Sequence, residues 1–270
     1  MMELLELAPV RRALAALFVT GAAFPSLGVF ILALELVPAR FAVMHASLLG
    51  AALGLLAGVD PLPPALLAAV LAGFGAAKLS ERGSASAGGP LGLFMVASLA
   101  LAFIVFHKAD VNAIEAFDLF WGSVLALSPS DLGLVVAGGV AIVVPVVLFL
   151  PELRAVLFDR VLARTFGIPA AFIHYALVSL VCLGIALAMR VTGALMVDAV
   201  TILPALAARS LGKGLGATLA WGAVFGVLAN FAGFALAVVL DLPTSPAIIV
   251  VGVLLVAGTA LYARLALRRA

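Results

Sequence analysis

The sequence predicts an all-α, multi-pass membrane protein, and its composition is the first observation behind that prediction. Of its 270 residues, 66% are hydrophobic and only 10% are charged, whereas a soluble domain is closer to half apolar and a quarter charged. The second observation is a repetition of apolar runs of about 20 residues, the length that one helix needs to cross a bilayer. We expect about nine transmembrane helices, at residues 13–36, 41–59, 62–79, 91–107, 131–150, 170–189, 192–209, 215–240 and 244–263.

Two segments between these runs are too polar to cross the membrane. Residues 107–131 have an acidic first half and an amphipathic second half, so we expect a short helix at the outer face. Residues 151–169 contain three arginines and are expected to be cytoplasmic, because loops rich in Lys and Arg stay on that side. Counting spans from this loop puts the C-terminus in the cytoplasm and the N-terminus outside, with Arg11 and Arg12 as the exception to the charge rule.

Charge and motifs exclude several classes of protein. The net charge of +2 is explained by basic cytoplasmic loops, so no nucleic-acid partner is expected. The single cysteine, Cys182, cannot form an internal disulfide. None of the three lysines is followed by Ser or Thr, so the chain lacks the end of a phosphate-binding loop. We therefore do not expect the chain to be an enzyme that hydrolyses ATP by itself.

The few polar side chains inside the spans are the candidate transport residues. His45 lies in the span 41–59, and Asp198 and Thr201 lie three residues apart on one face of the span 192–209. Pro204 in the same span removes the amide that would bond to the carbonyl of Val200. Ionisable residues inside a membrane are costly and typically mark transport pathways. Imidazole and carboxylate groups are also ligands of transition metals.

Each of these residues also has a structural interpretation. His45 could bond to a carbonyl of a neighbouring helix, and Asp198 could pair with Arg190 just outside the span. Asn230, in the middle of the span 215–240, is a further candidate for the transport pathway, but it is also typical of residues that hydrogen-bond across helices in lipid. Asp118 in the outer-face segment is the remaining candidate for the transport pathway.

Small residues predict close packing of the helices. Glycines recur at four-residue spacing in two spans, which lets helices approach closely in lipid. The expected packing residues are Gly50, Gly54, Gly58, Gly222, Gly226 and the kink-forming Pro204.

Five segments together resemble the membrane permease subunit of the zinc/manganese/iron ABC importers, over about residues 40 to 265. In order, these segments are "HASLLGAALGLL", "FDLFWGSVLALSPSDL", "FDRVLARTFGIP", "VTGALMVDAVTILPALAAR" and "DLPTSPAIIVV".

This resemblance implies one permease domain, residues 1–270, in the inner (cytoplasmic) membrane of a bacterium. It implies a homodimer bound to two cytoplasmic ABC ATPase subunits, which hold the ATP, and a periplasmic or lipid-anchored metal-binding protein that delivers the ion. No permanently bound cofactor is expected, only the transported divalent metal. The segment 153–169 is similar to the family's coupling segment, which docks on the ATPase, and its matching positions are Asp159, Ala163, Gly167 and Ile168.

One departure from the family concerns the metal path. The family usually has an aspartate four residues before the histidine, and this chain has Phe41 there. Asp198 is an unusual carboxylate for the family, but straight helices would place it about 14 Å from His45 in depth. The two are therefore expected to be successive stations at most.

Because a hard oxygen ligand is missing and a histidine remains, we expect zinc before manganese or iron. Two alternatives stay open. The cargo could be a metal chelate such as a siderophore, haem or cobalamin, or the chain could be a stand-alone secondary transporter, for which inverted repeats would be expected.

Overall fold

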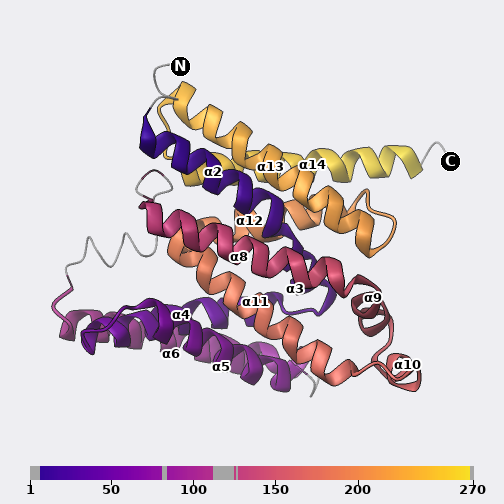
Figure 1. Ribbon diagram of the computed structural model, residues 1–270, viewed down its shortest axis with the longest axis horizontal. Coiled ribbons are helices and arrows are strands. Elements are labelled where there is room, and N and C mark those ends of the chain that lie inside the picture. The colour runs from indigo at the N-terminus through magenta and orange to yellow at the C-terminus, as the bar shows by residue number, and fades with distance from the viewer. Residues whose placement is uncertain (1–6, 81–83, 112–124, 126, 268–270) are drawn as a thin grey trace. The chain divides into compact units, whose positions relative to one another are not determined.

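Helices make up the regular structure of residues 7–80, 84–111, 125 and 127–267, the residues that this computed structural model describes (Figure 1). This confirms the predicted all-α fold class. In chain order the helices are α2 (Ala8–Ala23), α3 (Pro25–Ala33), α4 (Val37–Leu56), α5 (Leu62–Ser80), α6 (Ser84–Lys108), α8 (Pro129–Leu148), α9 (Leu150–Phe158), α10 (Arg160–Thr165), α11 (Ala170–Thr192), α12 (Ala194–Arg209), α13 (Leu215–Leu240) and α14 (Thr244–Leu267).

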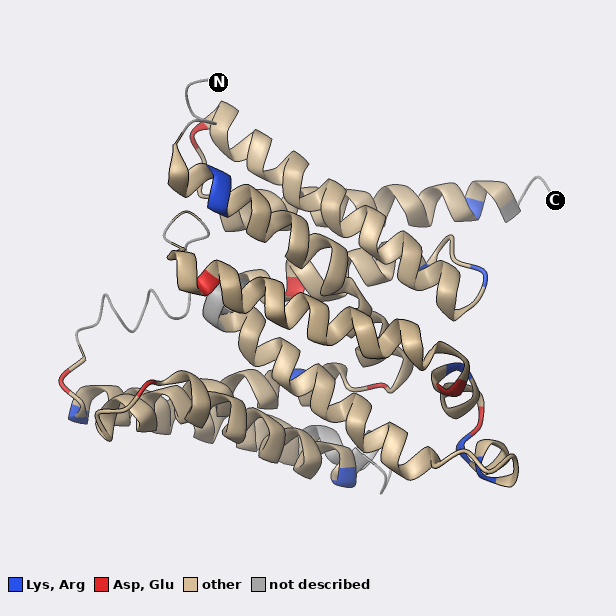
Figure 2. Cartoon of the chain, in the orientation of Figure 1, with Lys and Arg blue, Asp and Glu red and all other residues tan. Residues whose placement is uncertain are grey.

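Eight helical stretches in the described part of the chain are long and apolar enough to cross a membrane. They agree with eight of the nine expected spans, and α2 and α3 together form the first. The ninth range, 192–209, contains α12, whose 16 residues reach about 24 Å at 1.5 Å per residue. That is shorter than the hydrocarbon core of about 30 Å. Figure 2 shows that the long helices carry few charged residues along their lengths.

Local sequence signals explain where several helices begin and end. The first span breaks at Pro25, which has no amide to continue the ladder, and the Ser26 hydroxyl donates to the Ala23 carbonyl at 2.6 Å. Helix α8 begins with a capping box, in which Ser128 and Asp131 each accept a hydrogen bond from the other's backbone amide. The outer-face helix expected at residues 107–131 falls mostly on residues 112–124 and 126, outside the described residues.

The contacts divide the chain into two compact units, and the expected permease domain 1–270 includes both. Unit 1 comprises Met1–Val29, Trp121–Leu150 and Val191–Ala270. Unit 2 comprises Phe30–Phe120 and Pro151–Arg190.

In unit 1, α13 is the central helix. It packs against α2, α12 and α14, and α8 packs against α2. The packing is closest where glycines meet backbone: a Cβ added to Gly21 would lie 2.8 Å from the backbone of Gly226 and Val227. A Cβ on Gly233 would meet the backbone of Ile248 in α14 at 2.9 Å. Such approaches leave no room for a side chain.

In unit 2, α4 packs along both α5 and α6. A Cβ added to Gly50 of α4 would lie 2.8 Å from the Ala68 Cβ and 2.9 Å from the Ala65 Cα of α5. Gly54, one turn later, faces the Cα of Pro61 at 3.0 Å in the same test. The helix that carries His45 is therefore held tightly against α5.

Gly58 does not pack against another helix, contrary to expectation. No atom lies within 4 Å of a Cβ added there, and its φ of +68° is in the left-handed region. Its amide donates to the Leu55 carbonyl at 3.1 Å, and the next amide, of Val59, donates to the Gly54 carbonyl at 3.0 Å. This is a Schellman C-cap, so Gly58 ends α4. The four-residue spacing alone could not distinguish a packing glycine from a capping one.

Candidate functional site

The His45 imidazole is held in one tautomer by its own helix. Its Nδ1 lies 2.7 Å from the carbonyl oxygen of Phe41, one turn earlier in α4. Because a carbonyl oxygen can only accept, Nδ1 is the donor in this contact. The side chain is half-buried. A histidine whose Nδ1–H is fixed by a carbonyl presents Nε2 in the arrangement that metal-binding histidines use.

Phe41, at the position where the resemblance leads us to expect an aspartate, forms a cation–π pair with Arg40. The Arg40 guanidinium lies 4.2 Å from the centroid of the Phe41 ring. Arg40 is 4% exposed and Phe41 is 38% exposed. Phe41 therefore contacts His45 through its backbone carbonyl, which orients the imidazole.

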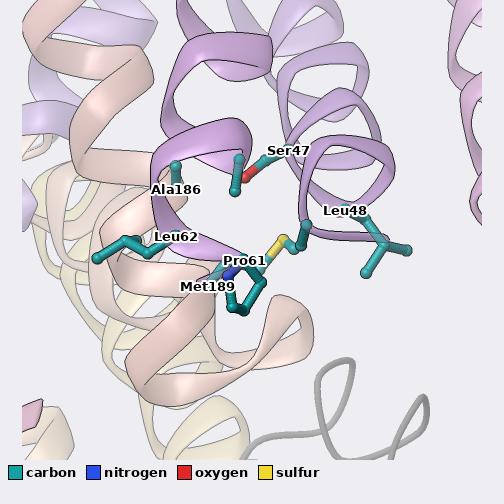
Figure 3. Close-up of a pocket in the computed structure, with 8 residues that line it drawn as sticks. Ser47, Leu48, Pro61, Leu62, Ala186 and Met189 are labelled. Carbon is teal, nitrogen blue, oxygen red and sulfur yellow. The ribbon is translucent and has the colours of Figure 1, made fainter. Parts of the chain in front are cut away.

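A small pocket lies beside α4 within unit 2 (Figure 3). Its volume is about 30 Å³, enough for one water-sized group. The Ser47 hydroxyl, two residues after His45, is buried and has no hydrogen-bond partner among the described residues. The lining residues come from α4, from Pro61 and the start of α5, and from α11: Ser47, Leu48, Ala51, Pro61, Leu62, Ala65, Ala186 and Met189.

Asp198, Thr201 and Pro204 lie together on α12 in unit 1. Asp198 is partly buried, and Thr201 is fully buried. The Thr201 hydroxyl donates to the Val197 carbonyl at 2.6 Å, so its proton is used inside its own helix. Helix α12 continues through Pro204. His45 belongs to unit 2, and its joint action with Asp198 stays a prediction.

Asn230 joins two helices of unit 1. Its Nδ2 donates to the Leu17 carbonyl at 2.7 Å and to the Thr20 hydroxyl oxygen at 3.2 Å, both in α2. The residue is fully buried, and its Oδ1 has no hydrogen-bond partner among the described residues. This geometry is what the interhelical interpretation predicts.

In the part of the chain that the structure describes, no three His, Cys, Asp or Glu side chains come together as a group that could hold a metal ion. Asp118, the other expected pathway residue, lies outside the described residues.

The segment expected to couple the chain to an ATPase forms two short helices, α9 and α10, separated at Asp159. The Asp159 carboxylate caps α10, accepting from the amides of Val161 at 2.7 Å and Leu162 at 3.0 Å. Gly167 ends α10 with a φ of +79°, and its amide donates to the Arg164 carbonyl at 3.0 Å.

Ala163 turns inward from α10. It is 2% exposed and forms a buried cluster with Val156 of α9 and Ala170 of α11, against which Ile168 packs. The four positions that match the family motif, namely Asp159, Ala163, Gly167 and Ile168, are thus the N-cap, the buried anchor, the C-cap glycine and a packed neighbour.

Phe158, just before Asp159, and residues between Asp159 and Gly167 form an apolar surface that the sequence pattern did not predict. Phe158 is 85% exposed, Val161 71% and Phe166 74%. Aromatic side chains that stand this far out of a short, arginine-containing segment are typical of an interaction site. The sequence did contain a signal for this surface. The caps at Asp159 and Gly167 set the two ends of α10 and so determine which of its residues stay exposed.

These features define a class: a multi-pass, all-helical membrane protein of the transporter kind, with polar residues in its helices and a short basic segment between two spans. The chain belongs to the ABC 3 transport family, whose match covers residues 6–262. It is thus a permease of the metal ABC importer family.

Relatives agree with this placement, and a solved structure shares the fold. The chain is 27% identical to the manganese transport system membrane protein MntC of Halalkalibacterium halodurans, covering 92% of this chain and 85% of the relative. It is 23% identical to the high-affinity zinc uptake system membrane protein ZnuB of Haemophilus influenzae, covering 83% and 86%. The solved structure of PsaBC from Streptococcus pneumoniae in complex with Fab shares the fold, with a TM-score of 0.84, 24% identity and coverage of 96% and 93%.

Proposed function

We propose that this chain is the permease subunit of an ATP-driven importer that moves a divalent transition metal into a bacterial cytoplasm by alternating access. The observation that carries the proposal is the family match over residues 6–262. Relatives named for manganese and zinc transport support the choice of cargo. ATP would be hydrolysed by a separate subunit.

The proposal is tested by reconstituting the chain with its ATPase and its metal-binding protein in vesicles. ATP-dependent accumulation of zinc, manganese or iron is expected. Accumulation that needs an ion gradient and no ATPase would instead identify a secondary transporter.

His45 is proposed as a station on the metal path. Its imidazole is oriented by the contact between Nδ1 and the Phe41 carbonyl, and imidazole nitrogens are common ligands of transition metals. A site with few ligands is weak, and a weak site suits transport because the ion must leave again. His45→Ala is expected to lower the initial rate of metal uptake about tenfold while the complex with the ATPase still forms. Normal uptake would leave His45 a packing residue.

Two observations favour different metals. A histidine without the family's aspartate favours zinc, since imidazole is a softer ligand than carboxylate. The printed names of several relatives favour manganese. Competition decides between them: unlabelled zinc and unlabelled manganese are compared as inhibitors of uptake of each labelled metal.

The apolar surface of α9 and α10 is proposed as the docking site for the ATPase. Phe158 and Phe166 are exposed, so truncating them removes little packing inside this chain. Phe158→Ala with Phe166→Ala is expected to release the ATPase during purification. Phe94→Ala in α6, another exposed phenylalanine, is the matched control and is expected to retain it.

The complete assembly is proposed to contain two copies of this chain, two ATPase subunits and a periplasmic or lipid-anchored metal-binding protein, in the bacterial inner membrane. The mass of the purified complex tests the stoichiometry, since two copies of each subunit and one copy of each differ twofold.

A further inference from the structure

Unit 2 contains both the segment proposed to dock on the ATPase and the residue proposed to bind the metal. The residues of α9 and α10 beyond Leu150, which would meet the ATPase, and His45 on α4, which would meet the metal, belong to this one compact unit. The contacts inside unit 2 therefore indicate how a movement of the docking segment could reach His45.

The coupling segment is joined to α11. Val156 of α9, Ala163 of α10 and Ala170 of α11 form one buried cluster, with Ile168 and Ile173 packed against it. A movement of α10 must then displace the beginning of α11, because a close-packed interior transmits strain.

Helix α11 is joined to α5 at two points. A Cβ added to Gly73 of α5 would overlap the sulfur of Cys182 in α11, so this sulfur fills the space above the glycine. Phe74, the next residue of α5, meets the Tyr175 ring edge-on, with ring centroids 5.8 Å apart. Cys182 is 3% exposed and Gly73 is buried. The Cys182 side chain therefore packs directly on the backbone of α5 at Gly73.

Helix α5 is joined in turn to α4, where Gly50 lies against Ala65 and Ala68. His45 is five residues, less than one and a half turns, before Gly50 in the same helix.

We propose that α5 is the relay that carries the movement of the coupling segment to His45, and that the contact between Gly73 and Cys182 is the positioning contact of this relay. The proposal rests on the function proposed above. Gly73 and Cys182 touch neither metal nor ATP; they keep α5 in step with α11.

The contact between Gly73 and Cys182 can be disrupted by one substitution and restored by a second. Gly73→Ala adds a methyl where the Cys182 sulfur lies. Cys182→Ala removes that sulfur, and the next atoms near the new methyl would be the residue 182 Cβ at 3.4 Å and the Val178 Cγ1 at 3.7 Å, which are ordinary contacts. The double variant Gly73→Ala/Cys182→Ala should therefore fit. Gly75→Ala is the matched control, because a Cβ there meets nothing within 4 Å and it is two residues away in the same helix.

The experiment measures ATP hydrolysed per metal ion imported, by the chain reconstituted with its ATPase and metal-binding protein. Gly73→Ala is expected to raise this ratio about tenfold, within the range of ordinary coupling free energies, while Gly75→Ala leaves it unchanged. The double variant is expected to return the ratio to within about twofold of the unaltered chain. A purely structural defect would lower the yield of complex and would not change the ratio of the complexes that form.

Three outcomes are distinguishable. An unaltered chain without ATP-driven uptake overturns the proposed function itself. With uptake established, equal ratios for Gly73→Ala and Gly75→Ala overturn the relay, as does a double variant that stays as impaired as Gly73→Ala. If Gly73→Ala does not accumulate in membranes, Tyr175→Leu is used, since it removes the second contact without adding volume; an unchanged ratio there also overturns the relay.

Discussion

Replacing Gly226 by alanine is expected to destabilise unit 1, whereas the same change at Gly222, one turn away, is expected to be tolerated. A Cβ on Gly226 would collide with the Gly21 carbonyl and approach the Pro25 Cγ at 2.7 Å. A Cβ on Gly222 would have as its nearest atoms the Pro25 Cβ at 3.3 Å and the Ala208 Cβ at 4.0 Å. Backbone atoms cannot move aside as a flexible side chain can.

The magnitude follows from two opposing terms. Alanine is favoured over glycine inside a helix by about 0.8–1.0 kcal/mol. Overpacking costs about 1–3 kcal/mol, and a backbone collision belongs at the upper end, so Gly226→Ala should cost about 2 kcal/mol net. For a chain of this size that corresponds to about 4–8 °C in melting temperature. Gly222→Ala should change it by less than about 2 °C, because a small overlap and the helix preference offset each other.

The assay is the apparent melting temperature of each purified variant in the same detergent, followed by tryptophan fluorescence at one fixed scan rate, since unfolding of such proteins is often irreversible. Gly21→Ala, on the other side of the contact, should match Gly226→Ala. Equal melting temperatures for the Gly222 and Gly226 variants would refute the packing of α2 on α13 described here.

Three further predictions concern the coupling segment, Asn230 and topology. Gly167→Ala places a side chain at a φ of +79°, which costs about 1–2 kcal/mol; it should lower the melting temperature by about 2–8 °C and reduce co-purification of the ATPase, and undiminished co-purification would contradict the C-cap role. Asn230→Ala should lower the melting temperature by only a few degrees, since a polar contact between membrane helices averages about 0.6 kcal/mol, and should preserve metal uptake; lost uptake at an unchanged melting temperature would make Asn230 a pathway residue. A fluorescent protein that folds only in the cytoplasm, fused to the C-terminus, should fluoresce, and a dark fusion of full length would show that α12 does not cross.

The fold was predictable because crossing a bilayer imposes a length and a composition that a sequence displays directly. The break at Pro25 was predictable for the same kind of reason, since proline has no amide to donate. The length of helix α12 was harder to predict. Residues 192–209 are mostly apolar, but Gly193, with a φ of +77°, interrupts the helix and leaves only 16 residues for α12.

The candidate site was predictable residue by residue and much less as an arrangement. The sequence indicates His45 and Asn230 as polar residues in spans, but the Phe41 carbonyl as the partner of His45 and Leu17 as the partner of Asn230 are known only from the fold. The Asn230 contact joins residues 213 apart in sequence, and no local pattern announces such a pair. Gly73 stands in no four-residue glycine repeat, so its contact with Cys182 also needed the structure.

The central claim is that this permease moves a transition metal past His45 when a partner hydrolyses ATP. The most direct test is the initial rate of metal uptake by vesicles that contain the unaltered chain or His45→Ala, each with the ATPase and the metal-binding protein, with and without ATP. We expect ATP-dependent uptake of zinc or manganese by the unaltered chain and about a tenfold lower rate for His45→Ala at equal amounts of complex. Equal rates with and without ATP, or equal rates for the two chains, would contradict it.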